Sequence, residues 1–218
     1  MKFLLFSKIS FNVSNPIALI ESFCFQSNFY SNYDLKNERK IEYVNRIGAR
    51  IERDSLRRCK SIISKRSNLS IFRHKLDGFL KLTERTRNNY IEELCEKVVK
   101  KLANINGIGF SKTTKILHTL HPDLIPMIDN PLQELYRKKI NLHWTEQQAS
   151  QIFIDYYENL KLEVNWKNLD KIYDVILKNK IPSLSKVRLF DILWWSFLKA
   201  KKLKDEKNIN WSSIKWKV

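Results

Sequence analysis

The stretch LANINGIGFSKTTKILHTLHPDLIPMID, from Leu102 to Asp129, is the most informative part of the chain. The protein has only four glycines, and two of them, Gly107 and Gly109, lie here with one residue between them. Three of its five prolines lie in the stretch or just after it, at positions 122, 126 and 131. Glycine and proline mark irregular backbone, and a chain with so few of them concentrates its irregular backbone here. We therefore predict a tight turn at Gly107–Gly109.

Apolar side chains on both sides of this turn follow the period of an α-helix. Before the turn, one wide apolar face is formed by Tyr90, Ile91, Leu94, Cys95, Val98, Val99 and Leu102. After it, a second face is formed by Thr113, Ile116, Leu117 and Leu120. Two helices joined by so short a segment must lie close together. The glycines supply positive φ angles, and we expect Ile105 and Ile108 to point back between the helices.

The backbone amides of such a turn suit a phosphate group. Glycine amides followed by the N-terminus of a helix form an anion site, because free N–H groups and the helix dipole converge there. Contacts of this kind hold a nucleic-acid backbone without reading its sequence. The residues predicted to bind DNA in this way are Ile105, Asn106, Gly107, Ile108, Gly109, Ser111, Lys112 and Lys115.

The charge of the chain favours a polyanionic partner. Lys and Arg number 40 against 23 Asp and Glu, a net charge of +17, and such a field attracts phosphate backbones. A lysine-rich composition without a partner, an anionic membrane and an acidic protein are the alternatives. A long basic helix predicted from Leu35 to about Lys65 carries an apolar stripe (Ile41, Val44, Ile47, Ile51). Its arginines, at positions 46, 50, 53, 57 and 58, are either a phosphate-facing surface or an ordinary solvated face.

Two motifs in the opening stretch resemble a known family. Leu102-x-x-Ile105-x-Gly107-Ile108-Gly109 resembles the helix–hairpin–helix motif, with Asn106 where proline is common. The segment IPMID, ending at Asp129 and 20 residues after the second glycine, resembles the loop that delivers an essential aspartate in the helix–hairpin–helix (HhH-GPD) DNA glycosylase superfamily. This resemblance, over about 30 residues, implies an all-α protein with two helical lobes and a cleft. It also implies a base excision repair activity that hydrolyses the N-glycosidic bond of a damaged or mispaired base in double-stranded DNA.

The chemistry of that reaction gives Asp129 a role. The target base must leave the helical stack, and breaking its bond leaves an oxocarbenium-like sugar. A carboxylate stabilises this charge and orients a water molecule. Asp-Asn-Pro is also a good helix start. Asp129 therefore either caps the next helix and takes part in the reaction, or caps that helix alone. The alternatives to an enzyme are a non-catalytic helix–hairpin–helix DNA-binding protein and a basic RNA-binding or scaffold protein.

The resemblance extends to cofactors and to a second activity. Family members that also cut the strand use a lysine two residues after the second glycine, where this chain has Ser111. Lys112 lies about 100° further round the helix, so we predict a monofunctional hydrolase, with Lys112 a nucleophile only if the helix starts one residue out of register. The hairpin carbonyls of the family often hold a monovalent cation. The resemblance places the corresponding carbonyls of this chain at Ala103, Ile105 and Ile108. No iron–sulfur cluster is expected, because the three cysteines (Cys24, Cys59, Cys95) are far apart.

The remaining candidates are weaker. A metal site could be formed by His118, His121 and Asp123, but the sequence offers no fourth ligand near them, so no metal site is predicted. Trp194 and Tyr136 are candidates for the pocket of a flipped base, with core packing as the alternative for Trp194 and a surface position for Tyr136.

The whole chain is predicted to be all-α, since helical spacing is nearly continuous and alternation of period two is scarce. We place residues 35–130 in a central lobe that contains the hairpin motif (102–120), and residues 1–34 with 131–218 in a second lobe. No apolar run is long enough for a membrane span, and the N-terminus lacks a signal-peptide cleavage site. A monomer in the cytoplasm, nucleoid or nucleus is expected.

Overall fold

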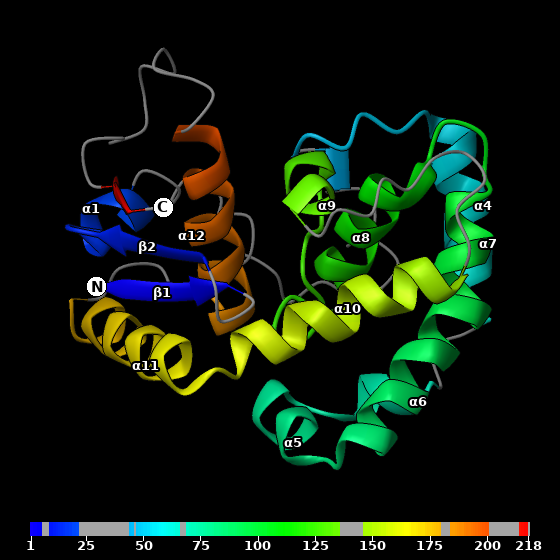
Figure 1. Cartoon of the computed structure of the whole chain (residues 1–218). Helices are drawn as coiled ribbons and strands as arrows, with labels where there is room; N and C mark the ends of the chain where they lie inside the picture. The colour runs from blue at the N-terminus through cyan, green and yellow to red at the C-terminus, as the bar shows by residue number, and fades with distance from the viewer. Residues whose placement is uncertain are drawn as a thin grey trace. The chain divides into compact units, whose positions relative to one another are not determined.

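A computed structural model of the chain describes residues 1–5, 9–21, 44–45, 47–65, 69–135, 146–179, 184–200 and 214–217 (Figure 1). The chain divides into two units. One unit comprises Met1–Tyr33 and Glu158–Val218, and the other comprises Asp34–Tyr157. Most of the described residues are helical, which confirms the predicted helical character. No helix in these ranges is long and apolar enough to cross a membrane.

The unit Asp34–Tyr157 contains the Leu102–Asp129 stretch and consists of helices. They are α4 (Arg53–Ser64), the 3₁₀ helix η2 (Ser70–Arg73), α5 (Leu76–Lys81), α6 (Glu84–Leu94), the π-helix η3 (Cys95–Val99), α7 (Lys100–Ala103), α8 (Gly109–Leu120), α9 (Asn130–Leu135) and most of α10 (Glu146–Leu160). The predicted helix before the turn is therefore α6, η3 and α7 in one continuous run. Its apolar face is buried, with Leu94, Val99 and Leu102 each 0% exposed.

The long basic helix predicted from Leu35 to about Lys65 is confirmed over Arg53–Ser64 and is wrong at the described residues before Arg53. Helix α4 begins only at Arg53, because the backbone leaves helical geometry at Gly48 and Arg50, whose φ angles are 81° and 50°. The Asn45 side chain holds this turn: its Oδ1 accepts from the Ile51 amide at 2.6 Å and its Nδ2 donates to the Ile51 carbonyl at 2.8 Å. A short polar side chain that bonds to nearby backbone competes with helix formation in this way.

The unit Met1–Tyr33 with Glu158–Val218 contains a small sheet that the sequence did not predict. Strands β1 (Lys2–Leu5), β2 (Ile9–Val13) and β3 (Ile214–Lys217) pair antiparallel in that order, and Figure 1 shows them beside α1 (Pro16–Glu21), α11 (Glu163–Lys178) and α12 (Lys186–Ala200). Phe3 lies opposite Phe11 in the register. The Phe11 ring stacks on Phe3 at 5.4 Å and on Phe197 of α12 at 4.7 Å. The sheet is thus held by aromatic packing against a helix.

The division of the chain also differs from the prediction. The first boundary, between Tyr33 and Asp34, lies within one residue of the predicted one, but the second lies between Tyr157 and Glu158 and not after residue 130. Helix α10 explains the difference. Its Phe153 ring meets Phe110 of α8 at 5.9 Å, and its Tyr157 ring meets Phe79 of α5 at 4.9 Å. Most of α10 therefore belongs to the core around the hairpin.

Candidate nucleic-acid interface

The turn between α7 and α8 is a glycine hairpin. Gly107 and Gly109 have φ angles of 76° and 62°, the positive values that the sequence predicts. The Ile105 amide donates to the Leu102 carbonyl and the Ile108 amide donates to the Ile105 carbonyl, both at 3.0 Å. A Cβ atom on either glycine would meet nothing within 4 Å. Glycine is therefore required here by backbone conformation and not by lack of space.

The hairpin buries its apolar side chains and exposes its tip. Ile105 and Ile108 are 6% and 4% exposed, whereas Asn106 and Gly107 are exposed at the tip. Within the described part of the chain, the amides of Asn106, Gly107 and Gly109 donate to no protein oxygen. Three amides without a protein acceptor, the last of them at the start of a 12-residue helix, fit the anion site expected from the sequence, and the binding of an anion there stays a prediction.

The carbonyls of the hairpin are bonded from the protein side. The Ser55 hydroxyl of α4 donates to the Asn106 carbonyl at 3.2 Å. The Lys112 ammonium donates to the Gly107 carbonyl at 2.7 Å and to the Arg50 carbonyl at 3.2 Å. These bonds fix the carbonyls of the tip and do not involve its amides. Lys112 also places a full positive charge behind the amides.

This position of Lys112 bears on two predictions of the sequence. Its amine is directed at the hairpin's own carbonyls, and its role as a nucleophile stays a prediction. The carbonyl site for a monovalent cation also stays a prediction. The Ile105 carbonyl, one of the three assigned to it, accepts the Ile108 amide, and the adjacent Gly107 carbonyl has the Lys112 ammonium on it. The chain thus supplies a positive charge of its own next to that site.

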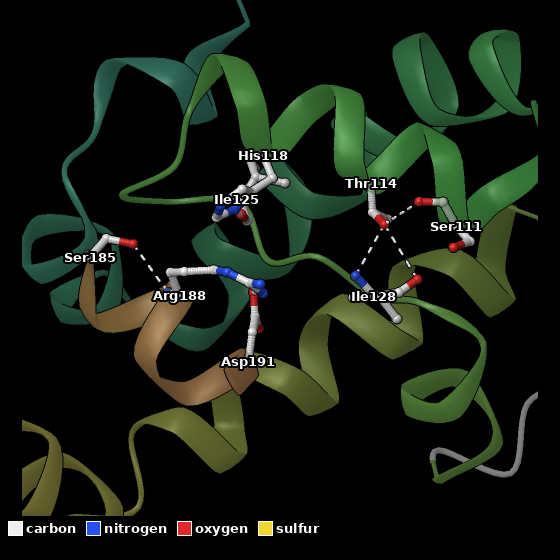
Figure 2. A network of polar contacts seen from close by, with 8 residues as sticks. All are labelled: Ser111, Thr114, His118, Ile125, Ile128, Ser185, Arg188 and Asp191. Carbon is white, nitrogen blue, oxygen red and sulfur yellow. Dashed lines mark hydrogen bonds and ion pairs between the residues drawn. The ribbon is translucent and has the colours of Figure 1, made fainter. Parts of the chain in front are cut away.

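The loop between α8 and α9 is anchored on α8 (Figure 2). The buried Thr114 hydroxyl accepts from the Ile128 amide at 3.0 Å. It has one proton to donate, and the Ser111 carbonyl at 2.9 Å is closer than the Ile128 carbonyl at 3.3 Å. One turn further along α8, His118 Nδ1 lies 2.5 Å from the Ile125 carbonyl. Since a carbonyl only accepts, Nδ1 carries the proton in this contact.

Two further side chains hold the same loop from other helices. The Gln133 amide of α9 donates to the Ile128 carbonyl at 3.1 Å, and the Tyr157 hydroxyl of α10 donates to the Leu124 carbonyl at 2.7 Å. Every residue from 124 to 128 is buried. The segment before Asp129 is therefore a fixed part of the core, although it has no regular secondary structure.

Asp129 follows directly on this anchored segment. Its carbonyl accepts from the Gln133 amide at 2.9 Å, so Asp129 occupies the N-cap position of α9, as the Asp-Asn-Pro pattern predicts. The residue is half-buried, and its Oδ1 atom is buried. The capping position is thus present, and the catalytic role stays a prediction.

The other candidate residues fall into different environments. Trp194 is 0% exposed and its ring lies 4.9 Å from that of Phe190, while Tyr136 lies outside the described residues. The His121 ring stacks on Phe72 at 4.1 Å. In the described ranges no group of three or more His, Cys, Asp or Glu is placed to hold a metal ion. The base-pocket residues stay predictions.

Of the three cysteines, Cys59 and Cys95 are buried and form no disulfide bond, and Cys24 lies outside the described residues. Burial of the Cys59 thiol raises its pKa from an ordinary value of 9.0 to about 11, although a backbone hydrogen bond and the Arg58 charge act in the opposite direction. The thiol is therefore protonated and unreactive at neutral pH.

Helix α12 contains a buried ion pair that the sequence analysis did not single out. Arg188 Nη1 lies 3.9 Å from Asp191 Oδ2, with the two side chains 10% and 1% exposed (Figure 2). The Ser185 hydroxyl caps the helix by accepting from the Arg188 amide at 3.1 Å. The i, i+3 spacing of Arg188 and Asp191 was the available signal.

No family model, curated protein or solved structure matches the chain. Its function is therefore argued from the geometry of its own residues.

Proposed function

We propose that the protein is a DNA N-glycosylase of the helix–hairpin–helix type, which removes a damaged or mispaired base from duplex DNA. One observation carries the proposal. The same helix, α8, begins at the three hairpin amides without a protein acceptor and anchors, through Thr114 and His118, the loop that ends at Asp129. A phosphate grip and a carboxylate are thereby built on one rigid element.

The spacing of these two parts fits a DNA strand. Thr114, which holds Ile128, lies five residues after Gly109 on α8. At 1.5 Å per residue this is about 7.5 Å along the helix axis, or about two nucleotides of one strand at 3.4 Å each. On this proposal, amides that hold one phosphate leave a nearby nucleotide of the same strand beside the loop that ends at Asp129.

The chain's residues would divide the reaction as follows. The hairpin amides and Lys112 hold the strand without reading its sequence, so the target nucleotide can leave the stack. The bond between C1′ and the base nitrogen breaks, and its electron pair leaves with the base. Asp129 stabilises the positive charge that develops on the sugar and orients a water molecule. The water oxygen bonds to C1′, and its proton passes to the carboxylate and then to solvent.

The test uses duplex oligonucleotides that each carry one damaged or mispaired base. Abasic sites left by the protein are revealed by alkaline cleavage, and cleavage before alkali reports lyase activity. We expect alkali-dependent cleavage of at least one duplex, its loss in Asp129→Asn, and its retention in Asn130→Ala, which changes the exposed neighbour. Lyase activity would assign a role to Lys112, and Lys112→Ala would then abolish it.

A non-catalytic DNA-binding protein is the second candidate, because the capping position of Asp129 accounts for that residue without chemistry. In that case every duplex would be bound and remain intact, and Asp129→Asn would bind DNA as the wild type does. Absence of DNA binding would exclude both candidates.

A further inference from the structure

A pocket beside the hairpin has the chemistry of a second phosphate site. It has a volume of about 330 Å³ and is lined by Arg58, Ser61, Ile62, Lys101, Asn104 and Ile105. These residues come from α4, from the last turn of α7 and from the hairpin itself. The sequence assigned only Ile105 to the DNA-binding hairpin, and it left Arg58 open between a phosphate-facing surface and a solvated face.

The position of the pocket ties it to the hairpin. Asn104 is the C-cap residue of α7 and Ile105 is the first residue of the hairpin after it. On α4, Arg58 lies one turn after Ser55, whose hydroxyl donates to the Asn106 carbonyl at 3.2 Å. The two helices contact each other (Figure 1). The pocket therefore lies between α4 and α7 and next to the tip of the hairpin.

The two basic side chains of the pocket differ from their neighbours. Arg57 lies 3.6 Å from Asp54, and Lys97 lies 2.7 Å from Glu93. Arg58 and Lys101 are exposed, and among the residues that the structure describes no carboxylate pairs with either. Two uncompensated cations on one pocket favour an anionic ligand.

The remaining lining residues suit a nucleotide. Ser61 and Asn104 have side chains that can donate hydrogen bonds to phosphate or sugar oxygens. Ile62 is half-buried and Ile105 is buried, so they give the pocket an apolar side. The C-terminal end of α7 opposes an anion, but a helix end carries only about half a negative charge. The full charges of Arg58 and Lys101 outweigh it.

We propose that this pocket binds a second phosphate of the DNA strand that the hairpin holds, with the attached sugar against Ile62 and Ile105. The inference rests on the DNA binding in the proposed function and is independent of the base-removing reaction. It extends the contact from the hairpin tip to α4, and it gives one member of the arginine-rich stretch, Arg58, a phosphate-facing role.

The salt dependence of DNA binding tests this inference. The double variant Arg58→Gln/Lys101→Gln is compared with the wild type by fluorescence anisotropy on an undamaged duplex. Loss of two phosphate contacts should reduce the slope of log affinity against log salt by about 1.8. Raising the salt from 50 to 200 mM should therefore weaken DNA binding about tenfold less in the variant than in the wild type. The variant Arg58→Lys/Lys101→Arg keeps both charges and should keep the wild-type slope.

A matched control separates the pocket from the overall charge. Lys81→Gln/Arg85→Gln removes the same charge from exposed positions on α5 and α6 of the same unit and should change the slope by less than half as much. Equal slopes for the pocket variant and the wild type, or equal losses for pocket and control variants, would overturn the inference. If the wild type binds DNA but removes no base, the proposed reaction is wrong, and the comparison of salt slopes still tests the pocket.

Discussion

Thr114 is the residue through which α8 holds the loop before Asp129, and its hydroxyl is the most informative atom to remove. Thr114→Val replaces it with a methyl group of similar size and preserves the packing of a fully buried side chain. The Ile128 amide then loses its acceptor at 3.0 Å, and it cannot bond to water instead because Ile128 is 0% exposed. An unsatisfied buried donor costs about 1–3 kcal/mol. For a chain of this length the melting temperature should fall by about 2–12 °C.

The same substitution should slow base removal more than it weakens DNA binding. Ile128 precedes Asp129, so a loop released from α8 displaces the carboxylate while the hairpin amides stay in place. A displacement of 1 Å can cost about 10²-fold in rate. Single-turnover base removal, measured with enzyme in excess and below the melting transition, should fall by about that factor, with an unchanged dissociation constant for DNA.

Two variants control this experiment. Thr114→Ser keeps the hydroxyl and should retain most of the rate. Thr119→Val removes a hydroxyl from the same helix that donates only to the Lys115 carbonyl, at 2.8 Å, and should leave the rate unchanged. A wild-type rate in Thr114→Val, or an equal loss in Thr119→Val, would refute the account of Thr114 as the residue that positions Asp129.

Three further predictions concern the hairpin and the core. Gly107→Ala and Gly109→Ala should each cost about 1–2 kcal/mol of stability, because left-handed backbone disfavours a Cβ, and should weaken DNA binding at moderate salt; unchanged affinity in the double variant would exclude the hairpin as the binding site. Lys112→Met removes the ammonium from the Gly107 carbonyl and should weaken binding to undamaged and damaged duplexes alike, as measured by competition titration. A loss of affinity for one lesion only would contradict this. Cys59 should resist labelling by maleimide in the folded protein at pH 7, and rapid labelling without unfolding would contradict its burial. Because the pKa of this thiol is raised on folding, the free energy of unfolding should decrease as the pH rises from about 9 to about 11.

The parts of the fold that local sequence determines were predictable. The hairpin follows from two glycines between two apolar faces, and the N-cap position of Asp129 follows from the Asp-Asn-Pro pattern. The break before α4 was missed because Asn45 and Gly48 act there together, through a side-chain bond to Ile51 that apolar spacing does not reveal.

Interactions between distant residues were not predictable. Strand β3 pairs with β2 through residues about 200 positions apart in the sequence, and no local pattern encodes that pairing. Thr114, His118 and Tyr157 anchor the loop before Asp129, yet in the sequence each looks like an ordinary helix residue. Sequence therefore located the hairpin and the helix-capping position of Asp129, and the structure was needed to find the side chains that hold the loop before Asp129.

The central claim is that the carboxylate at the end of the anchored loop acts on a nucleotide held by the hairpin. Single-turnover base removal by Asp129→Asn, on the duplex that the wild type cleaves best, tests it most directly, because asparagine keeps the size and the capping ability of the side chain. We predict a rate at least about 10²-fold below that of the wild type, with DNA affinity and melting temperature nearly unchanged. A wild-type rate in this variant would contradict the claim.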